Sequence, residues 1–102
     1  MAKTLKKGIF ITLDGPEGCG KSTQSKRLGA ELKSEGYDVI LTQEPGDTML
    51  GKLIREILLQ KKGFDISPEA ELFLFESDRA QHVREVIMPA LMDGKIVICD
   101  RF

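Results

Sequence analysis

Residues 9–22 read IFITLDGPEGCGKS and combine an apolar run, a glycine-rich loop and the start of a helix. The run at residues 9–14, IFITLD, has the continuous apolar pattern of a parallel strand whose two faces are both covered. Residues 21–35 have a helical pattern, and Gly36 follows as the glycine that ends such a helix. Strand, glycine loop and helix together predict the opening unit of an α/β fold.

The loop at residues 15–22, GPEGCGKS, matches the phosphate-binding pattern GxxxxGK[ST] in full. Its glycines let backbone N–H groups turn toward a phosphate, and the following helix directs its positive end at the same anion. Lys21 can reach the β- and γ-phosphates, and the Ser22 hydroxyl can ligate Mg²⁺. A glycine turn without a ligand would need neither group at those offsets. We therefore predict nucleoside triphosphate binding by Gly15, Pro16, Glu17, Gly18, Cys19, Gly20, Lys21, Ser22 and Thr23.

Two more elements follow the first helix. Residues 37–42, YDVILT, predict a second strand, and a loop with Pro45 and Gly46 comes after it. Residues 49–60 carry apolar side chains at helical spacing, so we expect one face of this second helix to pack in a core.

The rest of the chain predicts further helices and a last strand. Ser67 and Pro68 have the side-chain oxygen and the fixed φ of a helix start, and this third helix runs to about residue 82. Residues 83–92 are also helical in pattern, but Pro89 predicts a break or kink. Lys95 begins the strand that ends in IVICDRF. The order β-α-β-α-α-β predicts a doubly wound parallel sheet of the P-loop NTPase type.

Composition argues against several classes of partner. The 102 residues carry 15 basic and 16 acidic side chains, and a net charge of -1 gives no general attraction to nucleic acid or membrane. Cys19 and Cys99 form no CxxC pair, and the single histidine completes no zinc site, so we expect reduced thiols. The short apolar stretch near the N-terminus is no signal peptide or membrane span. We expect a cytoplasmic protein.

The phosphate-binding loop leaves the reaction open. A GTPase would carry DxxG and NKxD motifs, whereas this chain has no DxxG and no asparagine. A small kinase is the natural remaining candidate. Another P-loop nucleotide or nucleoside kinase, and a nucleotide-binding module without turnover of its own, remain as alternatives.

Four stretches, DGPEGCGKSTQ, LTQEPGDTMLGKLIREIL, SPEAELFLFESDRAQHVREVIMPAL and GKIVICDRF, resemble bacterial thymidylate kinases in order and spacing. The resemblance implies transfer of the ATP γ-phosphoryl group to the 5′-phosphate of dTMP, with Mg²⁺, to give dTDP for dTTP biosynthesis. It also implies a homodimer as the intact protein. Because the match covers about the first half of the family's domain, we expect residues 1–102 to be the N-terminal portion of one P-loop nucleoside monophosphate kinase domain. The 102-residue chain alone, without lid and C-terminal part, should be inactive.

The resemblance assigns residues to the dTMP site. Arg55 and Arg101 correspond to arginines that hold the dTMP phosphate, a task that suits a planar bidentate guanidinium. Phe75 and Arg79, four apart on one helix face, correspond to residues that stack on thymine and hydrogen-bond its carbonyl edge.

Without the resemblance, Phe75 would be interpreted as a core residue. The three residues before it, Leu72, Phe73 and Leu74, can supply core contacts, which leaves Phe75 free to face a ligand.

The resemblance also assigns acidic residues. Glu17 corresponds to an acid that faces the 3′-hydroxyl of dTMP, and Asp100 to an acid in the Mg²⁺ and water shell. Glu44 and Pro45 correspond to a loop that lines the acceptor site. His82 is expected on a helix surface rather than in catalysis. The predicted catalytic set is Lys21, Arg101, Asp100 and Glu17, with Ser22 and Asp100 as metal ligands.

Two substitutions depart from the family pattern. Bacterial members usually read REPGGT, whereas this chain reads QEPGDT, so Gln43 replaces an arginine and Asp47 replaces a glycine. One cation is lost and one anion gained near the expected acceptor phosphate. The variable loop positions contain no Lys or Arg, so we expect the catalytic arginine to come from a lid beyond Phe102.

Overall fold

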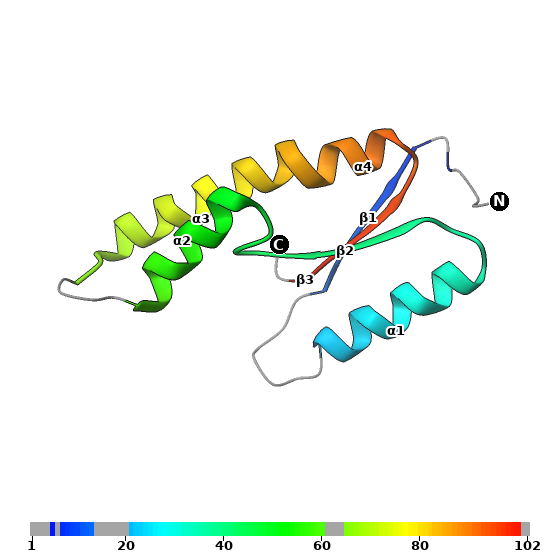
Figure 1. Ribbon diagram of the computed structural model, residues 1–102, viewed down its shortest axis with the longest axis horizontal. Coiled ribbons are helices and arrows are strands. Elements are labelled where there is room, and N and C mark those ends of the chain that lie inside the picture. The colour runs from blue at the N-terminus through cyan, green and yellow to red at the C-terminus, as the bar shows by residue number, and fades with distance from the viewer. Residues whose placement is uncertain (1–4, 6, 14–20, 61–64, 101–102) are drawn as a thin grey trace.

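The computed structural model describes residues 5, 7–13, 21–60 and 65–100, which form a parallel sheet with helices on both faces (Figure 1). None of the helices in these ranges is long and apolar enough to span a bilayer. The α/β class and the order β-α-β-α-α-β agree with the prediction. The elements are β1 (Ile9–Leu13), α1 (Lys21–Ser34), β2 (Val39–Gln43), α2 (Met49–Gln60), α3 (Pro68–His82), the π-helical turn η1 (Val83–Ile87), α4 (Met88–Met92) and β3 (Ile96–Asp100).

The last strand of the sequence lies in the middle of the sheet. β3 pairs with β1 on one side and with β2 on the other, and both pairs are parallel. The register places Leu13, Asp100 and Gln43 level with one another at the carboxyl ends of the three strands. The segments that leave these residues therefore begin at one edge of the sheet, where ligands bind in folds of this kind.

The central strand divides its side chains between two hydrophobic clusters. Ile96 and Ile98 face the cluster covered by α1, and Val97 faces the cluster covered by η1 and α4. Burying an aliphatic side chain of this size contributes about 1.5–3 kcal/mol, so these residues anchor both helical layers to the sheet. The other buried members are Val39 in the first cluster and Ile87 and Ala90 in the second.

Local signals in the sequence account for the helix ends. Gly36 has a φ of 97°, its N–H donates to the Lys33 carbonyl at 3.0 Å, and the Tyr37 N–H donates to the Leu32 carbonyl at 3.1 Å. This is a Schellman ending, as predicted for a glycine at that place. At the start of α3, the Ser67 hydroxyl accepts from the Ala70 N–H at 3.1 Å. The predicted N-cap is therefore confirmed.

A π-helical turn marks the predicted break between α3 and α4. In η1 the hydrogen bonds widen by one residue, so that the Met88 N–H donates to the Val83 carbonyl. Pro89, which has no N–H, follows directly in the first turn of α4. The wider turn changes the hydrogen-bond register just before the proline, because a proline cannot continue the regular α-helical pattern.

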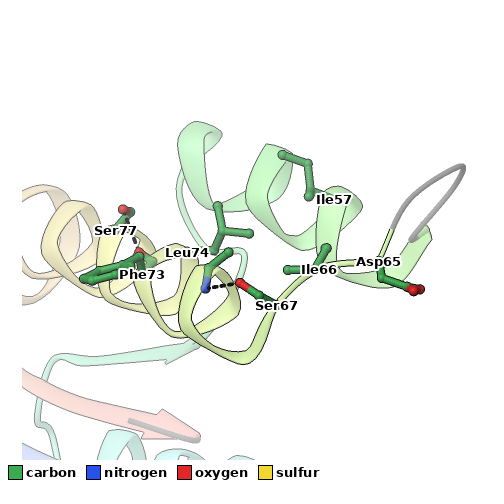
Figure 2. A pocket seen from close by; sticks show the side chains of 8 residues that line it. Ile57, Asp65, Ile66, Ser67, Phe73, Leu74 and Ser77 are labelled. Atoms are coloured by element: carbon green, nitrogen blue, oxygen red, sulfur yellow. Dashed lines mark hydrogen bonds between the residues drawn. The ribbon is translucent and has the colours of Figure 1, made fainter.

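The apolar residues early in α3 are less buried than the sequence suggested. Leu72 and Phe73 are 57% and 69% exposed, so the expectation that they supply core contacts was wrong. Phe73 and Leu74 instead border a cavity of about 540 Å³ between α2 and α3 (Figure 2). Phe75 lies two residues beyond Phe73, on another side of the helix, and lines a separate cavity. Phe75 is therefore not enclosed by the described part of the chain.

Candidate functional site

The carboxyl edge of the sheet holds a polar cavity of about 270 Å³. Asp100, at the end of β3, lines it as predicted for a residue at a strand's carboxyl end. The Asp100 carbonyl also accepts a hydrogen bond from the Glu44 N–H at 3.2 Å, which ties the loop after β2 to the central strand. The other residues that line the cavity are Ser25, Lys26, Leu41, Thr42, Gln43 and Asp47.

Part of the predicted site lies outside the described residues. α1 begins at Lys21, as expected for a helix that follows a phosphate-binding loop, and Thr23 is exposed in its first turn. The side chains of Lys21 and Ser22 are not among those described. The remaining predicted residues outside the described ranges are Gly15, Pro16, Glu17, Gly18, Cys19, Gly20 and Arg101.

The loop that follows β2 is held by the start of α2 and by α3. Its Glu44–Pro45 peptide bond is cis, and Gly46 has a φ of 111°, which favours glycine. The Gly46 N–H donates to Asp78 Oδ1 of α3 at 3.2 Å. The Thr48 hydroxyl accepts from the Gly51 N–H at 2.8 Å and so caps α2. The backbone of this loop is thus fixed from two helices.

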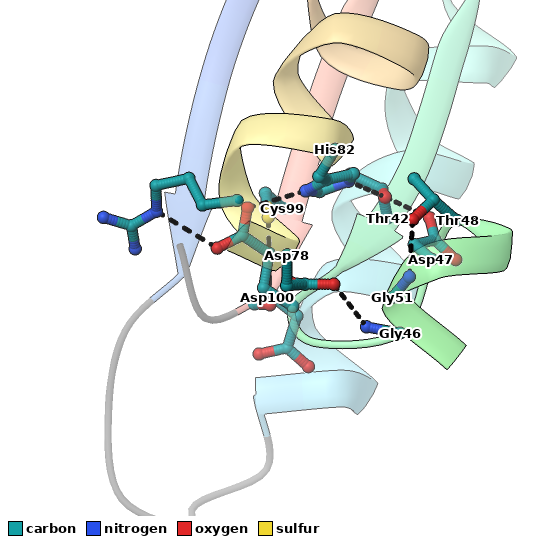
Figure 3. A network of polar contacts seen from close by, with 11 residues as sticks. Thr42, Gly46, Asp47, Thr48, Gly51, Asp78, His82, Cys99 and Asp100 are labelled. Carbon is teal, nitrogen blue, oxygen red and sulfur yellow. Dashed lines mark hydrogen bonds and ion pairs between the residues drawn. The ribbon is translucent and has the colours of Figure 1, made fainter. Parts of the chain in front are cut away.

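A chain of polar contacts joins this loop to α3 (Figure 3). Glu44 Oε1 accepts from Arg79 Nε at 3.2 Å, and Glu44 Oε2 lies 2.7 Å from His82 Nδ1. His82 Nε2 lies 2.5 Å from the Thr42 hydroxyl oxygen, and that hydroxyl donates to the Asp47 carboxylate. The five side chains link the end of β2, its loop and one side of α3 into a single network.

His82 is only 1% exposed, so the expectation that it lies on a helix surface was wrong. A lone histidine in a polar stretch is usually exposed, and the sequence does not state which loop will fold against it. The i, i+4 spacing of Asp78 and His82 was the available signal, because it puts two polar side chains on one helix face. Both are buried, and Asp78 is a further polar position of this site that sequence reasoning missed.

The described residues that the resemblance assigns to a dTMP site gather around the same loop. Arg55 of α2 donates from Nη1 to the Pro45 carbonyl at 3.3 Å. Arg79 reaches Glu44 from the other side, and Phe75 precedes it by one helical turn with 39% of its surface exposed. The structure therefore brings Glu44, Pro45, Arg55 and Arg79 together, with a partly exposed aromatic ring on the adjoining turn.

Asp47, which departs from the family pattern, faces the network. Its carboxylate accepts from the Thr42 hydroxyl, and Asp47 also lines the cavity that contains Asp100. The added anion thus has a hydrogen-bond partner within the chain.

Burial changes the acidity of two groups close to the network. Burial raises the pKa of Asp78 above its ordinary value, although the hydrogen bond from the Gly46 N–H acts in the opposite direction. The second oxygen of Asp78, Oδ2, has no hydrogen-bond partner among the described residues. Burial also raises the pKa of the Cys99 thiol to about 12, so this group stays protonated and unreactive at neutral pH.

Comparison with known proteins identifies relatives along nearly the whole chain. The family model described as Thymidylate kinase matches residues 13–102. A probable thymidylate kinase from Pyrococcus horikoshii is 52% identical over 99 residues, which cover 94% of this chain and 48% of the relative. A thymidylate kinase from Pseudomonas fluorescens is 55% identical over 95 residues, which cover 93% of this chain and 45% of the relative. The chain spans about half the length of these curated relatives.

A solved structure has the same fold. The crystal structure of thymidylate kinase from Ehrlichia chaffeensis superposes with a TM-score of 0.83 and 44% sequence identity. The superposition covers 94% of this chain and 54% of that chain. The sheet order and the helical layers described above are therefore those of a P-loop kinase.

Proposed function

The chain belongs to the thymidylate kinase family, and we propose that the protein containing it transfers the γ-phosphoryl group of ATP to dTMP, giving dTDP. The observation that carries the proposal is the cluster around the loop after β2. There the partly exposed aromatic ring of Phe75 lies on the turn before Arg79, and the buried Glu44 carboxylate accepts a hydrogen bond from Arg79. An aromatic face and an oriented guanidinium suit a flat base with carbonyl oxygens.

Each described residue has a task in this proposal. Phe75 stacks on the thymine ring, and Arg79 donates to its carbonyl edge while Glu44 holds the guanidinium by its Nε–H at 3.2 Å. Arg55, held on the Pro45 carbonyl, supplies positive charge for the acceptor phosphate. Since donor and acceptor are both anions, holding them close and in line is the main work of such an enzyme.

The donor side rests on the phosphate-binding loop. Gly15 and residues 17–20 supply backbone N–H groups, Lys21 neutralises charge on the ATP phosphates, and Arg101 assists Arg55 at the acceptor phosphate. Glu17 faces the 3′-hydroxyl of dTMP. These roles come from the family resemblance and the motif, and they complete the site at the carboxyl edge of the sheet.

The oxygen donors at this edge fit a magnesium ion. Asp100, Asp47 and Thr42 all border one cavity, and Mg²⁺ sites in kinases use one or two carboxylates together with hydroxyl, water and phosphate oxygens. The Ser22 hydroxyl and Asp100 would hold the ion, which neutralises phosphate charge when bound.

The same proposal covers the rest of the protein. Residues 1–102 form the N-terminal portion of one kinase domain, and a lid supplies the catalytic arginine. The intact protein is a cytoplasmic homodimer that uses ATP and dTMP and binds neither nucleic acid nor membrane. This chain covers 48% and 45% of the two curated relatives named above. That coverage supports a domain of which residues 1–102 are the N-terminal portion.

A coupled assay of ADP release tests the proposed function. The intact protein should turn over dTMP with a kcat/KM at least tenfold above that for dCMP, whose amino group replaces a carbonyl at the edge assigned to Arg79, and above that for thymidine, which lacks the phosphate assigned to Arg55. The kcat/KM for dUMP, which differs from dTMP only by the 5-methyl group, should lie between that for dTMP and those for dCMP and thymidine. Equal use of all four acceptors would refute the proposal, and preference for thymidine would indicate a nucleoside kinase. The 102-residue chain assayed alongside should show no dTMP-dependent release.

A further inference from the structure

His82 connects the end of β2 to the arginine proposed to read the base. Its side chain is 1% exposed, and both ring nitrogens have an oxygen within hydrogen-bond distance. Nδ1 lies 2.7 Å from Glu44 Oε2, and Nε2 lies 2.5 Å from the Thr42 hydroxyl oxygen. Two partners on opposite sides of the ring fix the orientation of the buried His82 side chain.

The contacts that end on a carboxylate have a fixed direction. A carboxylate oxygen only accepts, so the one hydroxyl proton of Thr42 is donated to Asp47. Glu44 likewise only accepts, so His82 Nδ1 donates to it. The direction of the Nδ1 contact therefore rests on Glu44 alone, and Nε2 lies against the Thr42 hydroxyl oxygen.

Glu44 is held by two donors from α3, one on each oxygen. His82 Nδ1 donates to Oε2, Arg79 Nε donates to Oε1, and Glu44 is 7% exposed. The two donors are three residues apart on α3, so they approach from neighbouring positions on one side of the helix. If the hydrogen bond from His82 were lost, the Glu44 carboxylate could rotate while it still accepts from Arg79. The plane of the Arg79 guanidinium would then no longer be fixed.

We propose that His82 is a positioning residue for base recognition, which holds the Glu44 carboxylate so that Glu44 orients the Arg79 guanidinium. The inference rests on the proposed function, because it takes Arg79 to contact the base. It adds a specific prediction, namely that acceptor affinity depends on the Nδ1 contact of His82 and not on the Nε2 contact.

Two substitutions by amide side chains separate the Nδ1 contact from the Nε2 contact. In His82→Asn the side-chain amide nitrogen takes the place of Nδ1, and in His82→Gln it takes the place of Nε2. Both remove the ring, so they share the loss of packing. We expect His82→Gln to raise the KM for dTMP about tenfold, as for loss of a hydrogen bond to a charged group. His82→Asn should stay within about threefold of the unchanged protein, because it keeps a donor toward Glu44.

The measurements use the intact protein, with KM for dTMP, KM for ATP and kcat determined for each variant. The KM for ATP and kcat should stay within about twofold, because His82 acts only through Glu44 and Arg79. Equal dTMP KM values for the two variants, or parallel rises in both KM values, would overturn the proposal. Thermal unfolding of each variant identifies a folding defect. If the unchanged protein prefers another acceptor, the proposed function fails. The difference in KM between His82→Gln and His82→Asn, measured with that acceptor, still tests the role of His82.

Discussion

Replacing Gly51 by alanine tests how tightly α2, α3 and the loop after β2 pack together. A Cβ atom at this position would lie 2.3 Å from Asp78 Oδ1, 3.0 Å from Thr48 Oγ1 and 3.2 Å from Gly46 Cα. Two of these neighbours belong to the loop and one is a buried carboxylate. Because ordinary contacts begin at 3.4 Å, the Asp78 oxygen would have to retreat by about 1 Å.

That retreat breaks the hydrogen bond from the Gly46 N–H, which is 3.2 Å long before any change. Leaving a buried donor unsatisfied costs about 1–3 kcal/mol. Overpacking costs about 1–3 kcal/mol more. The helical preference for alanine over glycine returns at most about 1 kcal/mol. We therefore expect Gly51→Ala to lower the free energy of unfolding by about 1–5 kcal/mol and to raise the KM for dTMP.

Gly29→Ala in α1 is the matched control. The three atoms nearest to its added Cβ would all belong to the Leu41 side chain, with Cδ2 nearest at 3.0 Å, and Leu41 is 40% exposed and able to move. The helical preference should then leave this variant within about 1 kcal/mol of the unchanged protein. Urea unfolding of the intact protein and both variants gives the comparison. A Gly51→Ala protein as stable as the Gly29→Ala protein would refute the packing described here.

Two further predictions concern buried titratable groups near the site. Since burial raises the pKa of Asp78, its contribution to stability is complete below the ordinary carboxyl range and declines as pH rises through the raised value. Asp78→Asn removes that decline, so the free energy of unfolding of this variant relative to the unchanged protein should rise as the pH is raised above the ordinary carboxyl range, and a constant difference would contradict this assignment. Cys99, with a pKa raised to about 12, should resist alkylation by iodoacetamide in a folded Cys19→Ser background and react only after unfolding. Labelling of the folded protein at Cys99, detected by peptide mass spectrometry, would show that the thiol is accessible.

Much of the fold was predictable because its signals are local. The apolar run of β3, the glycine that ends α1 and the Ser67–Pro68 start of α3 each depend on a few neighbouring residues. Pro89 likewise predicted a break that the structure realises as the π-helical turn before it. In each case the physical cause is contained within one or two turns of chain.

The polar network was not predictable in the same way. His82 and Asp78 resemble surface residues in the sequence, and they become buried only because the loop after β2 folds against α3. Phe73 resembles a core residue but is exposed. The prediction that Phe75 and Arg79 belong to a ligand site came from the family resemblance, because periodicity alone favoured a core role for Phe75. Contacts between residues 32 or more positions apart decide the cases of His82 and Asp78.

The central claim is that Arg79, held by Glu44, binds the acceptor base, and the KM for dTMP of Arg79→Gln tests it most directly. Arg84→Gln is the control, because Arg84 is an exposed arginine on η1, two residues beyond His82 and outside the network. In the intact protein, Arg79→Gln should raise the KM for dTMP at least tenfold and leave the KM for ATP within about twofold, as for loss of a charged hydrogen bond to one substrate. Arg84→Gln should change neither value. An unchanged KM for dTMP in Arg79→Gln, or an equal rise for ATP, would contradict the account.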